Sequence, residues 1–154
     1  MEPGLISGWV TRGIVGAGEA MFPENDYLAP DWRSTELVSR TFGYLDELPP
    51  AQRRLLLALF VVTELLGGWL AARPRRFSKL SVASREQAIR GWRASRHALL
   101  RMLGDSLKAV LTMPYASHPS VLVHLGEYRS CAHPGDGLPI PHVPDALVRQ
   151  GAAE

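Results

Sequence analysis

The chain has 154 residues, a length typical of one folded domain, and 46% of them are hydrophobic, which is enough to form a buried core. The formal net charge of +2 is too small by itself to indicate nucleic-acid binding. A single cysteine, Cys131, excludes an intramolecular disulfide framework. The first residues show neither a basic segment followed by an apolar one nor a twin-arginine pair, so we expect a cytoplasmic protein.

Apolar residues recur at helical spacing through most of the chain, which predicts an all-α fold of about five helices. Ser7, Asp31 or Ser34, and Ser81 are candidate N-caps. Prolines separate the segments, and Pro114 and Pro119 are expected to bracket a turn. The expected helices cover 5–21, 31–48, 50–72, 81–95 and 96–113, with one further short helical turn over 120–125.

The segment 55–70, LLLALFVVTELLGGWL, organises the rest of the chain. It is apolar on all sides of a helix, which is typical of a buried core helix or a membrane span. We favour burial in protein, because the run is shorter than the roughly 20 residues of a span and Glu64 lies past its middle. The other helices are therefore expected to pack around this central helix.

Two further helices give expectations about single side chains. In 81–95, Ile89 and Trp92 are expected to point inward, while Arg85 and the other charged residues point mostly outward. In 96–113, the inward stripe is expected to begin at Leu99 and to continue with Leu103, Leu107, Val110 and Leu111.

Residues 126–154 show no sustained periodicity and contain four prolines, which favours an extended, polyproline-like path. The predicted organisation is a helical domain over 1–128 and an extended C-terminal arm over 129–154. Four residues of the arm are candidate metal ligands, but their spacing matches no zinc pattern, so we expect no metal site there. These residues are Cys131, His133, Asp136 and His142.

Candidate catalytic groups are few. The segment GIVGAG at 13–18 follows no strand, so small residues at a helix–helix contact are favoured over a dinucleotide-binding loop. Cys131 and His133 lack a third group that would orient them as nucleophile and base. Glu64 is expected to be buried and to form a salt bridge or hydrogen bond with another helix, with a proton-transfer role as the less favoured alternative.

Several short strings carry a resemblance to a known family: RFSKLS at 76–81, Arg85-Glu86 with Arg90 and Trp92 after it, YASHP at 115–119 and GEY at 126–128. Over 37–128 the chain resembles the gluconate 2-dehydrogenase subunit 3 family. It is also similar to the helical N-terminal region of some alcohol oxidases of the glucose-methanol-choline (GMC) flavoenzyme class.

The resemblance implies a non-catalytic small subunit that binds and stabilises a large FAD-dependent oxidoreductase acting on alcohol or sugar hydroxyls. FAD and the catalytic histidine would belong to the partner, and this chain would carry no cofactor. For Trp69, Phe77 and Tyr115, core packing and partner contact are both open, whereas Trp92 is expected in the core. The expected partner interface comprises Trp69, Arg76, Phe77, Tyr115, Tyr128, Pro139 and Pro141.

Three departures from the family pattern bear on this implication. The twin-arginine export signal of many members is missing, Val82 and Ser84 stand where proline and glutamate are usual, and 121–123 is aliphatic where an aromatic is usual. The loss of glutamate removes a capping box. The partner's substrate is therefore expected to differ from gluconate. The alternatives are a membrane-associated helical adaptor and a small enzyme that uses Glu64 or Cys131 with His133.

Overall fold

The computed structural model describes residues 3–25 and 28–125. These residues form six α-helices and one 3-10 turn, and no strand occurs among them, which confirms the all-α prediction. The predicted C-terminal arm lies outside the described residues. The helices are α1 (Pro3–Met21), α2 (Leu37–Asp46), α3 (Pro50–Leu70), α4 (Val82–Arg93), α5 (Ala98–Ala116) and α6 (Pro119–His124), and the 3-10 turn η1 is Phe77–Lys79.

Two helix boundaries differ from the sequence prediction by three residues or more, and the others agree within about two residues. The second helix begins at Leu37 rather than near Asp31, because Asp31 accepts a hydrogen bond from the Ser34 N–H (2.7 Å) within a separate turn and Glu36 is left-handed (φ 48°). The fifth helix continues through Pro114 to Ala116, so the predicted turn at Pro114 is wrong. Only the turn before Pro119 is present.

A side chain from α2 stabilises the end of α5 beyond Pro114. The Arg40 Nε donates to the Pro114 carbonyl (3.0 Å), and its Nη2 donates to Ser117 Oγ (2.9 Å). Carbonyls in the last turn of a helix lack partners within the helix and favour a nearby cation. Arg40 therefore satisfies one of the carbonyls in the last turn of α5.

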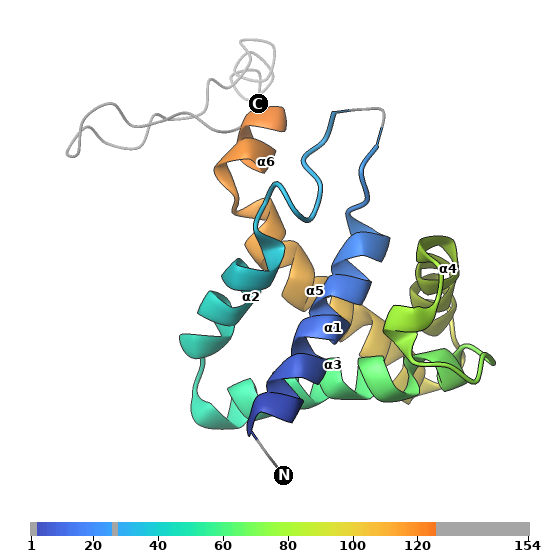
Figure 1. Ribbon diagram of the computed structural model, residues 1–154. Helices are drawn as coiled ribbons and strands as arrows, with labels where there is room; N and C mark the ends of the chain where they lie inside the picture. Colours follow the sequence, from blue (N-terminus) through green and yellow to red (C-terminus); the bar gives the residue numbers. More distant parts are fainter. Residues whose placement is uncertain (1–2, 26–27, 126–154) are drawn as a thin grey trace, which may run out of the picture.

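Helix α1 lies across α3 and also contacts α2, α4, α5 and η1, so it occupies the middle of the fold (Figure 1). Its glycines permit this close packing. A Cβ at Gly13 would lie 2.6 Å from the Phe60 carbonyl oxygen of α3, and one at Gly16 would lie 3.2 Å from the Phe77 ring. The interpretation of GIVGAG as a helix–helix contact is confirmed.

The core lies where α1, α3, α4 and α5 meet η1. Phe77 of η1 is fully buried, and its ring lies 5.6 Å from that of Trp92 in α4, which confirms the expected core position of Trp92. Gly68 lets the turn after α3 fold back, since the Arg73 N–H donates to its carbonyl (2.8 Å). A Cβ there would lie 1.7 Å from the Arg75 carbonyl oxygen.

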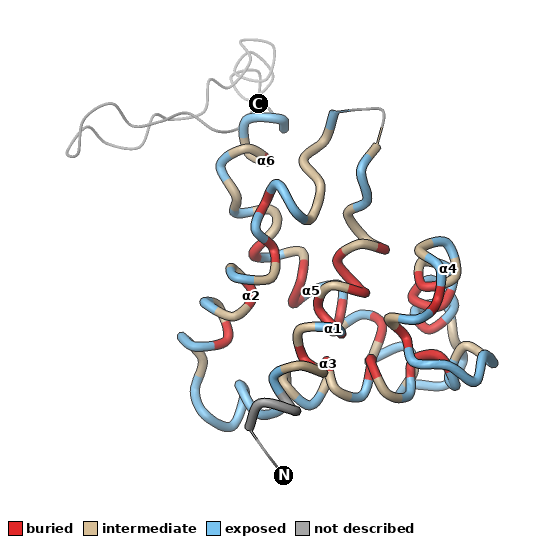
Figure 2. Tube along the Cα trace, in the orientation of Figure 1, coloured by how far each residue is buried: buried red, intermediate tan, exposed pale blue. Residues whose placement is uncertain are grey.

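Helix α3 distributes its polar and apolar residues in an unexpected way. Thr63 and Glu64, the only polar side chains of 55–70, are fully buried, while Leu55 is 70% exposed and Trp69 is 66% exposed. The tube in Figure 2 alternates buried and exposed segments along α3. Helix α3 contacts α1, α2, α4, α5 and η1, but it leaves one apolar face open, and α1 rather than α3 occupies the middle of the fold. In the described part of the chain, no helix is long and apolar enough to cross a membrane.

Candidate functional site

A groove of about 420 Å³ with an almost entirely apolar lining lies between α3 and α5 in the described part of the chain. We call it the α3–α5 groove. Ser106 is its only polar lining residue, and charged side chains are absent from its lining. The groove is lined by Leu55, Leu56, Ala58, Leu59, Val62 and Leu70 of α3 and by Leu99, Leu100, Met102, Leu103 and Ser106 of α5.

The groove exists because both helices carry apolar residues on two faces. In α3, the face with Phe60, Glu64 and Gly67 packs on α1 and η1, and the opposite face, with Leu55 and Val62, remains open. In α5, the inner face runs from Gly104 through Leu107 to Leu111 and Pro114. Contiguous exposed apolar residues of this kind mark binding surfaces for proteins, membranes or ligands.

The contribution of α5 corrects one sequence prediction. Leu99 was expected to begin the inward stripe, but it is 76% exposed, and Met102 is 61% exposed. The missed signal is the density of apolar residues at 99, 100, 102 and 103, which a single inward stripe cannot accommodate. Of the residues of α5, the expected interface included only Tyr115 and none of these groove residues.

One end of the groove is basic. Arg73 lines a second hollow that shares Leu70 and Leu100 with the groove, and Arg96 and Arg101 lie at the start of α5. All three side chains are exposed, and none forms an ion pair with another described residue. Asp105, on the same helix, is already paired with Arg93 (2.9 Å). The positive charge at this end is therefore not neutralised within the described fold.

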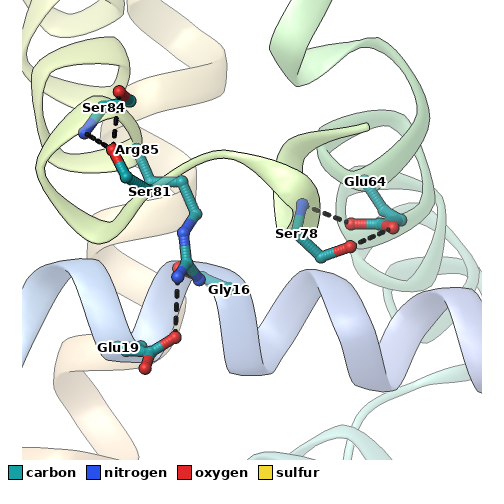
Figure 3. Close-up of polar contacts among 7 residues, drawn as sticks. All are labelled: Gly16, Glu19, Glu64, Ser78, Ser81, Ser84 and Arg85. Atoms are coloured by element: carbon teal, nitrogen blue, oxygen red, sulfur yellow. Dashed lines mark hydrogen bonds and ion pairs between the residues drawn. The ribbon is translucent and has the colours of Figure 1, made fainter. Parts of the chain in front are cut away.

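On the face of α3 opposite the groove, Glu64 is held by hydrogen bonds within the fold (Figure 3). Its carboxylate accepts hydrogen bonds from the Ser78 N–H (3.0 Å) and the Ser78 hydroxyl (2.7 Å) of η1. The Arg12 Nε of α1 lies 3.7 Å away. The expected pairing of Glu64 with other elements is confirmed, and its bonds join α3 to η1 next to α1.

Arg85 of α4 is buried, which corrects the expectation that it points outward. Its Nη1 donates to the Gly16 carbonyl (2.9 Å), and its Nη2 pairs with Glu19 (2.7 Å), as Figure 3 shows. Ser81 caps α4 as predicted by accepting from the Ser84 N–H (3.3 Å). Arg85 thus fixes α4 on α1.

The expected interface residues fall into four groups, the last of which is Tyr115 alone. Trp69 and Arg76 are exposed, as a partner contact requires. Phe77 is fully buried by its own chain, so the core alternative holds for it and its assignment to the interface is corrected. Three expected interface residues lie outside the described residues: Tyr128, Pro139 and Pro141. The candidate metal-ligand residues also lie outside them: Cys131, His133, Asp136 and His142.

Tyr115 connects α5 to the segment that follows α1. Its ring stacks on Phe22 with centroids 3.8 Å apart, and its hydroxyl donates to the Pro30 carbonyl (2.6 Å). Burial, followed by the negative charge of Asp31, raises the pKa of the Tyr115 hydroxyl. These contacts give Tyr115 a role inside the chain, and whether a partner also contacts it stays a prediction.

Among the described residues, no group of three or more His, Cys, Asp or Glu side chains could hold a metal ion. His118 instead caps α6, since its Nδ1 accepts from the Ser120 N–H (3.2 Å). In comparisons with family models, curated proteins and solved structures, nothing matches this chain.

Proposed function

We propose that this chain is a non-catalytic small subunit that binds and stabilises a large FAD-dependent oxidoreductase acting on alcohol or sugar hydroxyls. The observation that carries the binding role is the open, charge-free α3–α5 groove. A surface of this size and composition is costly to leave in water, and a partner that covers it gains the free energy of apolar burial.

The identity of the partner rests on the resemblance of 76–81, 85–92 and 115–119 to the family of small oxidoreductase subunits. Several residues of these strings make contacts that determine the fold. Phe77 fills the core, Ser78 binds Glu64, and Arg85 holds α4 on α1. The strings therefore support a shared helical scaffold, and the flavin chemistry of the partner follows from the family resemblance alone.

In this proposal the partner binds FAD and transfers hydride from the alcohol carbon to the flavin. The small subunit contributes no reacting group. It covers an apolar surface of the large subunit with its groove, and Trp69 lies at the rim of that contact because it is exposed next to Leu70. Trp and Arg are enriched among the residues that carry binding energy.

The first experiment is affinity purification of the tagged full-length chain from its native host, followed by an absorption spectrum of the product. We expect a larger protein to co-purify with the visible bands of bound flavin. A double variant, Leu99→Glu with Met102→Glu, should lose that protein, because two carboxylates would enter an apolar contact.

Val123→Glu is the matched control, since Val123 of α6 is also exposed (60%) but does not line the groove. It should retain the partner. A colourless product that contains this chain alone, prepared without detergent or high salt, would refute the proposed function.

A further inference from the structure

We infer that the α3–α5 groove binds an amphipathic α-helix of the partner protein, with acidic side chains beside its apolar face at the end where Arg73, Arg96 and Arg101 lie. The inference deepens the proposed function and rests on it only for the flavin chemistry of the partner.

The shape and length of the groove fit a helix. Its lining on α3 extends from Leu55 to Leu70, which spans about 22 Å at a rise of 1.5 Å per residue. The α5 wall, from Leu99 to Ser106, spans only about 10 Å, so the part enclosed by both helices fits about two turns of an occupying helix, which would present three to four apolar residues at i, i+3, i+4 and i+7. An extended segment would leave its own backbone N–H and C=O groups without partners, because the groove is lined by apolar side chains.

The positive charge at one end of the α3–α5 groove favours an occupant that carries negative charge at that end. The first turn of α5 contains no acidic residue, and Arg96 and Arg101 lie near its N-terminus, where the helix dipole already disfavours cations. Arg73 adds a third positive charge next to Leu70. Acidic side chains on the occupant would relieve this repulsion and would set the direction in which the helix lies.

An anionic bilayer also combines apolar and negative groups, and it is the main rival occupant. The groove is concave, with a volume of about 420 Å³ between two helices. A bilayer surface would contact the exposed rims and leave this hollow unfilled, whereas a helix fills it with side chains. The concave shape therefore favours a protein helix over lipid.

The test is site-specific photo-crosslinking in the native host. A photoreactive amino acid replaces Met102 in the groove, and in a control strain it replaces Val123 outside the groove. We expect Met102 to crosslink to one partner peptide with apolar residues at helical spacing and Asp or Glu at one end. The control position should not give that peptide.

A crosslink from Met102 to lipid, to a second copy of this chain or to a peptide without that pattern would overturn the inference, as would no crosslink at all. The identity of the crosslinked protein separates the two proposals. A peptide of the expected pattern from a protein without flavin refutes the proposed function alone. A co-purifying flavoprotein that crosslinks elsewhere refutes the groove assignment alone.

The charge component has its own control. Arg73→Glu with Arg101→Glu should weaken the complex about tenfold, because attraction to the acidic end becomes repulsion. Lys108→Glu changes the charge of α5 outside the groove and should leave the affinity within about twofold. Equal affinities for the double variant and the control, over a range of salt concentrations, would contradict the acidic end.

Discussion

Glu64 provides the sharpest test of how α3 is held, through the substitution Glu64→Gln. Glutamine keeps the shape of the side chain but offers one acceptor oxygen in place of two. One of the two donors of Ser78, the N–H or the hydroxyl, would then face an amide N–H₂ group.

The expected loss follows from these contacts. A hydrogen bond to a charged group contributes about 1.5–3 kcal/mol, and the Arg12 contact at 3.7 Å adds less than about 1 kcal/mol because Arg12 is half exposed. The neutral side chain recovers part of this, since it is easier to desolvate. We expect a net loss of about 2 kcal/mol, which lowers the midpoint of thermal unfolding by about 4–8 °C in a chain of this size.

Urea unfolding followed by tryptophan fluorescence measures the change, at low protein concentration so that association through exposed apolar surface is limited. Glu86→Gln is the control, because Glu86 forms an exposed i,i+4 pair with Arg90 and should cost less than about 0.5 kcal/mol. Ser78→Ala should be strongly non-additive with Glu64→Gln. A Glu64→Gln protein within about 0.5 kcal/mol of the wild type would refute a structural role for the carboxylate.

Three further variants test the remaining contacts. Gly13→Ala should lower the free energy of unfolding by about 1–3 kcal/mol in urea titrations, because its Cβ would lie 2.6 Å from the Phe60 carbonyl oxygen; an unchanged midpoint would contradict the close crossing of α1 and α3. Arg85→Met should cost about 3 kcal/mol, because the Gly16 carbonyl loses its partner and Glu19 loses its cation; thermal melts that match the wild type would contradict this. Tyr115→Phe should remove a pH dependence from the free energy of unfolding. Because the pKa of the hydroxyl is raised in the folded state, the stabilisation that it gives is complete below the pKa of the unfolded chain, about 10, and is lost as the pH rises through the pKa of the folded chain. Wild type and Tyr115→Phe should therefore converge in stability at alkaline pH, and a constant difference between them would contradict the bond to the Pro30 carbonyl.

The positions of the helices could be predicted from periodicity, but two local features could not. Pro114 was expected to end the fifth helix because proline lacks an N–H. The helix nevertheless continues to Ala116, and Arg40, which is 74 residues away in the sequence, binds the Pro114 carbonyl near its end. The predicted start of α2 was wrong because glutamate does not favour the left-handed backbone conformation that Glu36 adopts, and this conformation depends on the surroundings of the residue.

The candidate site was only partly predictable. Trp69, for which core and interface positions were both open, is exposed, and the residues of the groove on α5 were not identified. A helix that is apolar on all sides gives no periodic signal about which face is covered. In α3 the packing is decided by the fit of Gly13 and Gly67 against their neighbours and by Ser78, which accommodates Glu64 in the interior.

The placement of α1 has a consequence for the order of folding during synthesis. Helix α1 is made before the other described helices, yet it carries five glycines and should not be stable alone, since isolated helices need good helix formers or tertiary packing. The residues that fix it, Phe60 and Arg85, leave the ribosome about 45–70 residues later, whereas the bond between Glu64 and Ser78 spans only 14. We therefore expect α3 and η1 to form a local unit first, and the N-terminal helix to dock only when α4 has emerged.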